Sequence, residues 1–196
     1  HSFFPLLAAK IAGKPSLLIA GGMDCVSFPG IRYGNFHKSL LRTFTAWSFQ
    51  LAAHIAPKHA ALELCDYTYT PAGMPRQGIR HFLPRLKTPC TVIHNGYDAQ
   101  QWRMPGGKRE EKTFLTLSGA FQFPVIPVLK GIDLIIEVAP RFPDCRFIIA
   151  GVPEGYRMPL PPSAAELPAN ILLLPPQTQE ALPLLYGRAE YYLQLS

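Results

Sequence analysis

The chain has 196 residues, of which 48% are hydrophobic and 16% charged, and its formal net charge at neutral pH is +6. This composition is typical of a folded globular protein and excludes an intrinsically disordered chain. No apolar run reaches about 18 residues, the length that a transmembrane helix needs. The length allows one large domain or two small ones.

The positive charge is concentrated in the first half of the chain. Residues 1–95 hold ten Lys/Arg against three Asp/Glu, which gives +7, whereas residues 96–196 hold nine against ten, which gives −1. Such a basic half attracts an anionic membrane surface or an acidic acceptor, although a solvated basic surface explains it equally well. Nucleic acid is not an expected partner, because no recognisable reader motif accompanies the basic residues.

The cysteines give no sign of a metal site. Cys25, Cys65, Cys90 and Cys145 stand singly and lack the spacing of metal ligands. His37, His54 and His81 stand at no helical i, i+4 spacing from a carboxylate either. We therefore expect reduced thiols in a cytoplasmic protein and no bound metal.

The first half predicts alternating helices and strands. The apolar pattern indicates helix 3–11, strand 16–20, a long helix 36–54 capped by Asn35, strand 55–57, a helical turn 58–64, an irregular loop 66–78, a basic segment 79–86 and strand 91–94. The predicted inner face of the long helix is formed by Leu40, Leu41, Phe44, Trp47, Leu51 and Ile55.

The second half follows a polar, glycine-rich stretch at 103–112, which predicts a linker. After it we expect strand 113–118, an uncharged loop up to Lys130 and Gly131, helix 132–139, strand 146–150, a proline-rich loop 152–168, strand 170–174, helix 179–189 and strand 191–195. Apolar residues at 132, 135, 136 and 139 predict the buried face of the helix between the first two strands. Alternation of this kind predicts an α/β fold with parallel sheets.

The unit from 113 to 151 is the strongest candidate for a ligand site. In parallel sheets, ligands bind beyond the carboxyl ends of the strands, and those ends carry Gly119, Gly151 and Lys130 here. Lys130 precedes a helix whose first N–H groups are unpaired, a combination that suits an anionic phosphate. The alternative is that Lys130 is a solvated surface lysine.

A second candidate follows strand 16–20. Gly21 and Gly22 allow the backbone to approach a ligand closely, and Asp24 is the first acidic residue of the chain. Asp24 is either a catalytic group or a residue that stabilises the turn. Tyr33 lies in the loop that follows. Dinucleotide-binding, Walker and nucleophile-elbow motifs are absent.

Several segments together carry a family resemblance. They are the opening HSFFPLLAAK, the GGMD loop, the NGYD turn at 95–98, and the run from KGIDLIIEVA at 130 through PDCRFIIAG to YYLQLS at the end. In this order they resemble the retaining glycosyltransferases of family 4, over nearly the whole chain. These enzymes have the GT-B fold, which consists of two Rossmann-like domains.

The resemblance implies a domain division. Residues 1–98 would be the later part of the amino-terminal acceptor domain, 99–112 a linker, and 113–196 the first part of the donor domain. Both domains would be incomplete, and the chain would be an internal piece of a longer protein, inactive by itself.

The resemblance also implies site residues. Lys130 would neutralise the diphosphate of a nucleotide-sugar donor, with Ser118, Gly119, Gly131 and Gly151 around the phosphates. The loop that begins Leu174, Pro175, Pro176 would hold the nucleotide base. On the acceptor side, His1, Gly21, Gly22, Asp24 and Tyr33 match, with His1 and Asp24 as candidate catalytic groups.

Three departures from the family pattern stand out. Ala120 replaces an arginine that usually contacts the diphosphate, and Gly21-Gly22 replaces a common His-Gly. The family's pair of glutamates would begin just after Ser196.

The expected activity is therefore sugar transfer, with retention and without a metal, from a nucleotide sugar to a hydroxyl of a glycan or a lipid-linked acceptor. No cofactor is expected, because the nucleotide sugar is a substrate. The expected location is the cytoplasm, with contact to the inner face of a membrane where the basic half faces it. A nucleotide-sugar epimerase of the same fold and a non-catalytic nucleotide-sugar-binding scaffold remain as alternatives.

Overall fold

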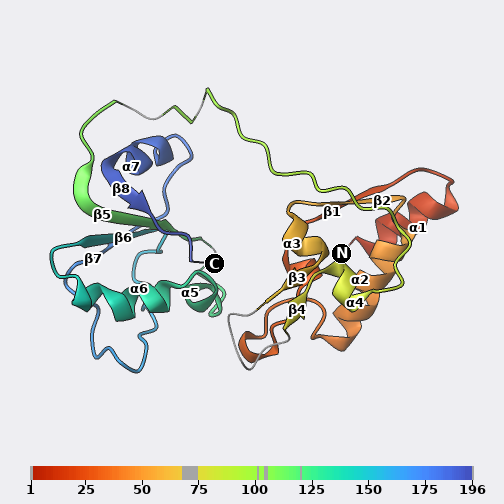
Figure 1. Ribbon diagram of the computed structural model, residues 1–196, viewed down its shortest axis with the longest axis horizontal. Helices are drawn as coiled ribbons and strands as arrows, with labels where there is room; N and C mark the ends of the chain where they lie inside the picture. The colour runs from red at the N-terminus through yellow and green to blue at the C-terminus, as the bar shows by residue number, and fades with distance from the viewer. Residues whose placement is uncertain (1, 68–74, 101, 104–105, 120, 196) are drawn as a thin grey trace. The chain divides into compact units, whose positions relative to one another are not determined.

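The computed structural model describes residues 2–67, 75–100, 102–103, 106–119 and 121–195. The chain divides into two compact units, His1–Gly96 and Tyr97–Ser196 (Figure 1). The roles of the two units as acceptor and donor domains stay a prediction.

The first unit is built on a parallel pair of short strands. β1 (Leu17–Ala20) pairs with β2 (His54–Pro57), with Leu18 opposite Ile55. Helices α1 (Phe3–Ile11) and α2 (Ser39–Leu51) pack against each other. The short elements are the 3-10 turns η1 (Met23–Cys25) and η2 (Pro29–Ile31), the helical turns α3 (Ala60–Glu63) and α4 (Ile79–Phe82), and the antiparallel strands β3 (Cys65–Asp66) and β4 (Arg76–Gln77).

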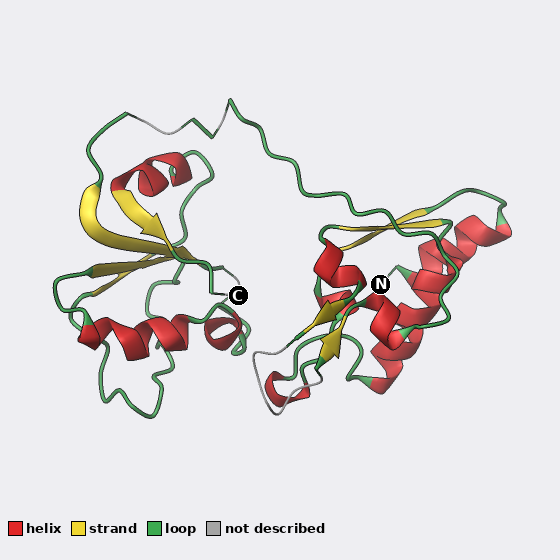
Figure 2. Ribbon diagram, viewed as in Figure 1, coloured by secondary structure: helices red, strands yellow, loops and turns green. Residues whose placement is uncertain are grey.

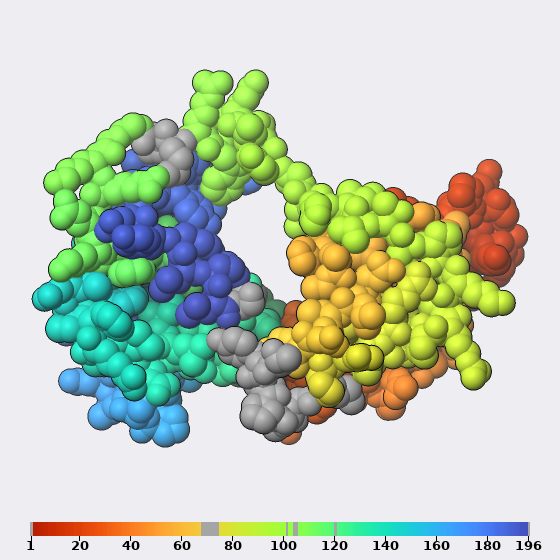
Figure 3. Space-filling model, viewed as in Figure 1, coloured from red at the N-terminus to blue at the C-terminus, as the bar shows by residue number. Residues whose placement is uncertain are grey.

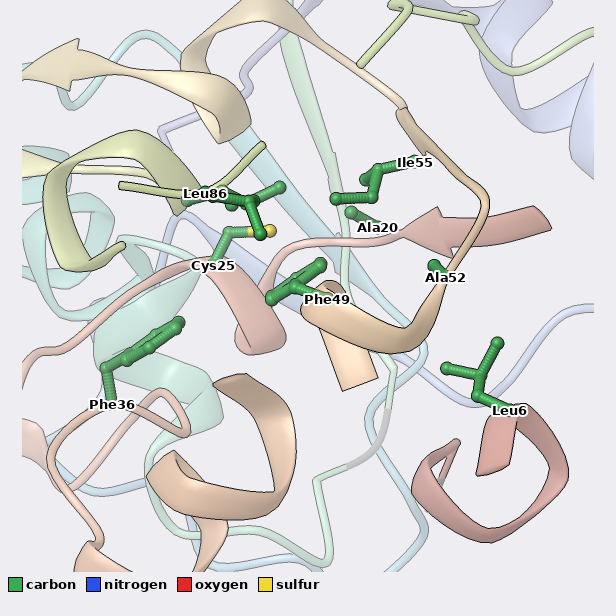
Figure 4. Close-up of a cluster of buried hydrophobic side chains, with 9 residues drawn as sticks. Leu6, Ala20, Cys25, Phe36, Phe49, Ala52, Ile55 and Leu86 are labelled. Atoms are coloured by element: carbon green, nitrogen blue, oxygen red, sulfur yellow. The ribbon is translucent and has the colours of Figure 1, made fainter. Parts of the chain in front are cut away.

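Side chains from strands, helices and loops form the core of this unit. The cluster contains Leu6, Ala20, Cys25, Phe36, Phe49, Ala52, Ile55 and Leu86, and Figure 4 shows that they come from segments far apart in the sequence. Phe49 and Ile55 are fully buried, so each contributes about 1.5–3 kcal/mol of hydrophobic stabilisation. Phe36 stacks on Phe82 with ring centroids 4.3 Å apart.

The long helix begins three residues later than predicted, and Asn35 does not cap it. The amides of Asn35 and Phe36 donate to the carbonyls of Met23 and Val26, at 2.8 and 3.3 Å, so both residues are held against the preceding loop. The Asn35 side chain donates instead to Thr45 Oγ1 at 3.1 Å. The helix therefore starts at Ser39, where these tertiary contacts end.

The inner face of the long helix was predicted correctly at its end, where Leu51 packs against the core and Ile55 is buried, but wrongly before it. Thr45, Ser48 and Phe49 are buried, whereas Leu40 and Trp47 are exposed. The hydroxyl of Ser48 donates to the carbonyl of Phe44 at 2.7 Å, so it is satisfied within the helix and can be buried at low cost. The aromatic rings of the predicted face turn toward α1, where Phe3 meets the rings of Phe44 and Trp47.

Other predictions for the first unit need smaller corrections. Residues 91–94 form no regular strand, but the amides of Thr91 and Ile93 donate to the carbonyls of Ile55 and Pro57, so this segment runs alongside β2. The predicted loop 66–78 includes strand β4, and the basic segment 79–86 begins with α4; residues 68–74 lie outside the described part of the chain.

The second unit contains a four-stranded parallel sheet. The strands are β5 (Glu110–Leu117), β6 (Arg146–Ala150), β7 (Ile171–Leu174) and β8 (Ala189–Tyr192), and their order across the sheet is β7-β6-β5-β8. The prediction of an α/β fold with parallel strands is thereby confirmed.

Helices cover both faces of this sheet (Figure 2). On one face, α6 (Ile132–Val138) and the 3-10 turn η3 (Ala139–Arg141) pack against Phe147 and Ile149 of β6. On the other face, α7 (Leu182–Arg188) packs against Ile148 and Ala150. Alternate residues of β6 thus point to opposite faces of the sheet. Because both faces are buried, the strand is apolar at every position after Arg146.

The apolar face of α6 was predicted correctly. Ile132, Ile135, Ile136 and Ala139 are all buried in the core on that side of the sheet. The β6–β7 connection is, as expected, a loop rich in proline and without a helix.

Several boundaries in the second unit differ from the predictions. The loop before Lys130 contains a helical turn, α5 (Ile126–Leu129), and β5 begins at Glu110, inside the predicted linker. β8 begins two residues early, because the predicted helix 179–189 ends at Arg188 and the chain enters the sheet at once. Across both units, no described helix is long and apolar enough to cross a membrane.

Candidate functional site

The strand order of the second sheet places a candidate site at the end of the sheet where the carboxyl ends of the strands lie. This end is called the carboxyl edge below. The first strand, β5, lies in the middle, with β6 and β7 on one side and β8 on the other. The direction of winding therefore reverses between β5 and β8, and ligands of open α/β sheets bind at such a point, beyond the carboxyl ends of the strands.

At this end of the sheet, backbone hydrogen bonds connect the segments that carry three residues of the predicted donor site, Ser118, Gly151 and Leu174. The amide of Ser118 donates to the carbonyl of Ala150 at 2.9 Å, and the amide of Gly151 donates to the carbonyl of Leu174 at 3.0 Å. Gly151 has a φ of +99°, and a Cβ at this residue would lie 1.7 Å from the carbonyl oxygen of Ser118. Only glycine allows the ends of β5 and β6 to approach so closely.

The segment after β8 completes this edge. The amide of Leu193 donates to the carbonyl of Leu115 at 2.8 Å, and the hydroxyl of Thr116 donates to the carbonyl of Leu193 at 3.1 Å. Gly131 has a φ of +64°, and a Cβ there would lie 2.6 Å from Cβ of Leu195. The end of the chain therefore passes directly over the turn that carries Lys130.

Lys130 lies in the turn between α5 and α6. Its amide donates to the carbonyl of Ile126 at 2.9 Å, which fixes the backbone, and its side chain is half-buried. Within the described ranges, the ammonium has no ion-pair or hydrogen-bond partner. The charge is thus available to an anionic ligand, and the interpretation of Lys130 as a solvated lysine is still open.

Two buried oxygen atoms at this edge have no hydrogen-bond partner among the described residues. They are Oγ of Ser118 and Oδ1 of Asp133, which lies in the first turn of α6. An unpaired buried polar group costs about 1–3 kcal/mol, so a ligand that donates a hydrogen bond here would relieve a penalty. Sequence reasoning did not single out Asp133, because an acid in a first helical turn is common for structural reasons.

The loop predicted to hold the base has few free carbonyl groups. The carbonyl of Leu174 accepts from the amides of Gly151 and Val152, at 3.0 and 2.9 Å. The carbonyl of Pro175 accepts from the Gln177 side chain at 2.7 Å. Pro175 and Pro176 are exposed.

On the predicted acceptor side, the carboxylate of Asp24 is hydrogen-bonded to its own loop. Oδ1 of Asp24 accepts from the amides of Gly21 and Gly22, at 3.2 and 2.9 Å. Burial raises the pKa of Tyr33, and the charge of Asp24 raises it further. This geometry favours the turn-stabilising interpretation of Asp24, and its catalytic role stays a prediction. His1 lies outside the described residues.

The surface pockets described for the second unit are not lined by the predicted donor residues. One, of about 420 Å³, lies beside β8 and is lined by Trp102, Arg109, Tyr186 and Tyr192, among others. The end of the chain (dark blue in Figure 3) lies at the surface of this unit. Among the described residues, no group of three or more His, Cys, Asp or Glu side chains could hold a metal ion.

Comparison with curated proteins finds relatives named D-inositol 3-phosphate glycosyltransferase. That of Mycolicibacterium paratuberculosis is 31% identical over 109 residues, which covers 50% of this chain and 24% of the relative. Those of Mycobacterium bovis and Mycobacterium tuberculosis are 31% identical over 110 residues, covering 50% of this chain and 22% of the relatives. Half of the chain is similar to glycosyltransferases.

This similarity supports the resemblance predicted from the sequence at the level of glycosyltransferases. The chain spans about a quarter of the length of these relatives. No protein-family model matches the chain.

Proposed function

We propose that this chain belongs to a retaining glycosyltransferase, and that its second unit binds the diphosphate of a nucleotide-sugar donor. The proposal rests on the topology of the sheet. Ser118, Gly119 and Gly151 follow the carboxyl ends of β5 and β6, and the Lys130-Gly131 turn precedes the helix between these parallel strands, so all of them lie at the same end of the sheet, where the winding reverses. Glycine at 119 leaves open space for a phosphate, since nothing lies within 4 Å of a Cβ built there.

Lys130 supplies positive charge at the leaving diphosphate in this proposal. A preorganised cation acts most strongly where charge develops in the transition state, so its ammonium stabilises departure of the nucleotide more than it stabilises the bound donor. The step breaks the anomeric C–O bond of the donor, whose electron pair leaves with the nucleotide diphosphate. A new C–O bond forms to the acceptor hydroxyl, whose proton passes to the released diphosphate. Because lysine provides the charge, the mechanism needs no bound metal.

The test uses the full-length protein that contains this chain. It is incubated with UDP-, GDP- and ADP-sugars, with and without polyol and lipid-linked acceptors, and the anomeric configuration of the product is read by NMR. Retention of configuration supports the proposal. Donor isomerisation without an acceptor would indicate an epimerase, and binding without turnover would indicate a scaffold.

Replacement of Lys130 by alanine in that protein should lower turnover by about 10²–10³, the usual loss for one well-placed electrostatic donor. The melting temperature should hardly change, because the side chain makes no ion pair or hydrogen bond with described residues. Lys130→Arg should restore activity only in part. Activity of the alanine variant within threefold of wild type would contradict this role.

The proposal includes contact of the first unit with an anionic membrane. Helices α1 and α2 expose Phe4, Ile11 and Trp47, and their charged residues are Lys10 and Arg42, without an acid. Aromatic rings beside cations suit the interface of an anionic bilayer. Co-sedimentation with vesicles should therefore be stronger for anionic than for neutral lipid and should weaken at about 0.5 M salt. Equal binding to both lipids would contradict it.

A further inference from the structure

The pocket beside β8 combines aromatic side chains from three parts of the second unit. Its volume is about 420 Å³, which lies within the range of small-molecule sites. Trp102 precedes β5, Tyr186 belongs to α7 and Tyr192 to β8, and this helix and strand lie next to each other in Figure 1. Among the described residues that line the pocket, none belongs to the predicted donor site.

Contacts hold the three rings together. The rings of Trp102 and Tyr186 meet edge to face, with centroids 5.9 Å apart, and the rings of Tyr186 and Tyr192 are tilted, with centroids 5.2 Å apart. The hydroxyl of Tyr192 donates to Oε1 of Gln194 at 2.9 Å. Burial, followed by a hydrogen bond with Tyr192, raises the pKa of Tyr186 to about 12. A perturbed phenol among aromatic rings in a pocket of this size is typical of a binding site.

The NGYD turn of the sequence places Trp102 in this pocket. Oδ1 of Asp98 accepts from the amide of Gln100 at 2.9 Å, and the carbonyl of Asp98 accepts from the amide of Trp102 at 3.2 Å. An aspartate that bonds to the backbone two residues later stabilises a tight turn. The turn therefore fixes the backbone at Trp102, and the indole ring contacts α7.

The two charged side chains that line the pocket differ in their contacts. Oε2 of Glu190 accepts from the amide of Lys112 at 2.6 Å. Arg109 is exposed, and among the residues that the structure describes its guanidinium has no ion-pair or hydrogen-bond partner. The available charge is thus positive. A quaternary ammonium, which aromatic rings also bind, would be repelled by Arg109.

We propose that this pocket binds a ring compound that carries one carboxylate. The rings of Trp102, Tyr186 and Tyr192 contact the flat face of the ligand, and the guanidinium of Arg109 donates two parallel hydrogen bonds to the carboxylate. A monoanion is a better match than the dianion of a phosphate monoester, because Glu190 lines the same pocket and repels additional negative charge. An aromatic acid and a sugar acid share this chemistry.

The inference goes beyond the proposed function and does not depend on it. Binding in this pocket requires neither a nucleotide sugar nor turnover. Failure of the proposed transfer reaction would therefore leave the inference standing, and an empty pocket would leave the proposed function untouched.

The experiment uses the fluorescence of Trp102 in the 196-residue chain. The chain contains two tryptophans, so Trp47→Phe leaves Trp102 as the only indole and keeps an aromatic ring beside Phe3 and Phe44. This protein is titrated with benzoate, with glucuronate and with the uncharged benzyl alcohol. We expect a saturable change with at least one acid, and a Kd for benzyl alcohol about tenfold or more above that of the acid. A response to benzoate alone assigns an aromatic acid, and a response to glucuronate alone assigns a sugar acid.

Arginine variants in the same background test the carboxylate contact. Arg109→Ala should raise the Kd about tenfold or more, and Arg109→Lys should restore binding only in part, because an ammonium cannot make the two parallel bonds. The matched control is Arg103→Ala, which removes an exposed arginine close in sequence that does not line the pocket and should leave the Kd within about twofold. The inference is overturned if neither acid gives a saturable response, if phenyl phosphate binds more tightly than both acids, or if Arg103→Ala weakens binding as much as Arg109→Ala.

Discussion

Replacement of Gly151 by alanine tests whether the close approach of the ends of β5 and β6 forms the candidate donor site. A Cβ at this residue would lie 1.7 Å from the Ser118 carbonyl oxygen, about half of an ordinary contact distance. Both atoms belong to rigid backbone, so one strand end must move. That movement strains the bonds from Ser118 to Ala150 and from Gly151 to Leu174.

The magnitude follows from these contacts. Alanine at a φ of +99° costs roughly 1 kcal/mol on its own. Weakening two backbone hydrogen bonds adds about 1 kcal/mol each. We therefore expect the free energy of unfolding of the second unit to fall by about 3 kcal/mol, a large share of the 5–15 kcal/mol of an ordinary domain.

A matched control separates the clash from the backbone conformation. Gly155 has a φ of +71°, but nothing lies within 4 Å of a Cβ built there. Gly155→Ala should therefore cost only roughly 1 kcal/mol. The assay is urea unfolding, together with hydrogen exchange of the Leu115 and Ile148 amides, which report on the second unit alone. A cost for Gly151→Ala equal to that for Gly155→Ala would refute the reasoning.

Three further predictions concern single side chains. Asp24→Ala should lower the free energy of unfolding by roughly 1–2 kcal/mol, because the amides of Gly21 and Gly22 lose their acceptor. Asp24→Asn keeps an acceptor oxygen and should lose less. Equal losses of the two variants in urea unfolding would contradict this prediction. Burial raises the pKa of Tyr186 to about 12 from 10.0. The folded state therefore favours the protonated phenol, and the free energy of unfolding should fall between pH 10 and 12, by less in Tyr186→Phe than in wild type. Identical pH profiles of the two proteins would contradict this prediction. Burial, followed by the Asp24 charge, also raises the pKa of the Cys25 thiol, which should react with a thiol reagent at pH 8 only after unfolding, whereas Cys65 should react in the folded protein.

Elements defined by local patterns were predictable from the sequence. The strands β6 and β7 and the buried face of α6 consist of apolar residues whose spacing alone determines burial. The start of α2 was not predictable. It depends on the amides of Asn35 and Phe36, which bond to a loop about ten residues earlier and hold the chain out of the helix.

The candidate donor edge was predictable in outline, since parallel strands bring Gly119, Gly151 and Lys130 to one side of a sheet. The contacts that complete this site were not predictable. The contact of Leu195 with Gly131 depends on the placement of β8 beside β5, and the unpaired Oδ1 of Asp133 depends on packing around α6.

The central claim is that the edge around Lys130 binds a nucleotide diphosphate. Isothermal titration of the chain with UDP, GDP and ADP tests it most directly, with Lys130→Ala as the variant. Lys108→Ala is the matched control, because Lys108 is an exposed lysine of the same unit that pairs with Glu111. We predict that at least one nucleotide binds, that Lys130→Ala raises its Kd about tenfold or more, and that Lys108→Ala leaves it within twofold. Absence of binding by all three nucleotides, or equal weakening by both variants, would contradict the claim.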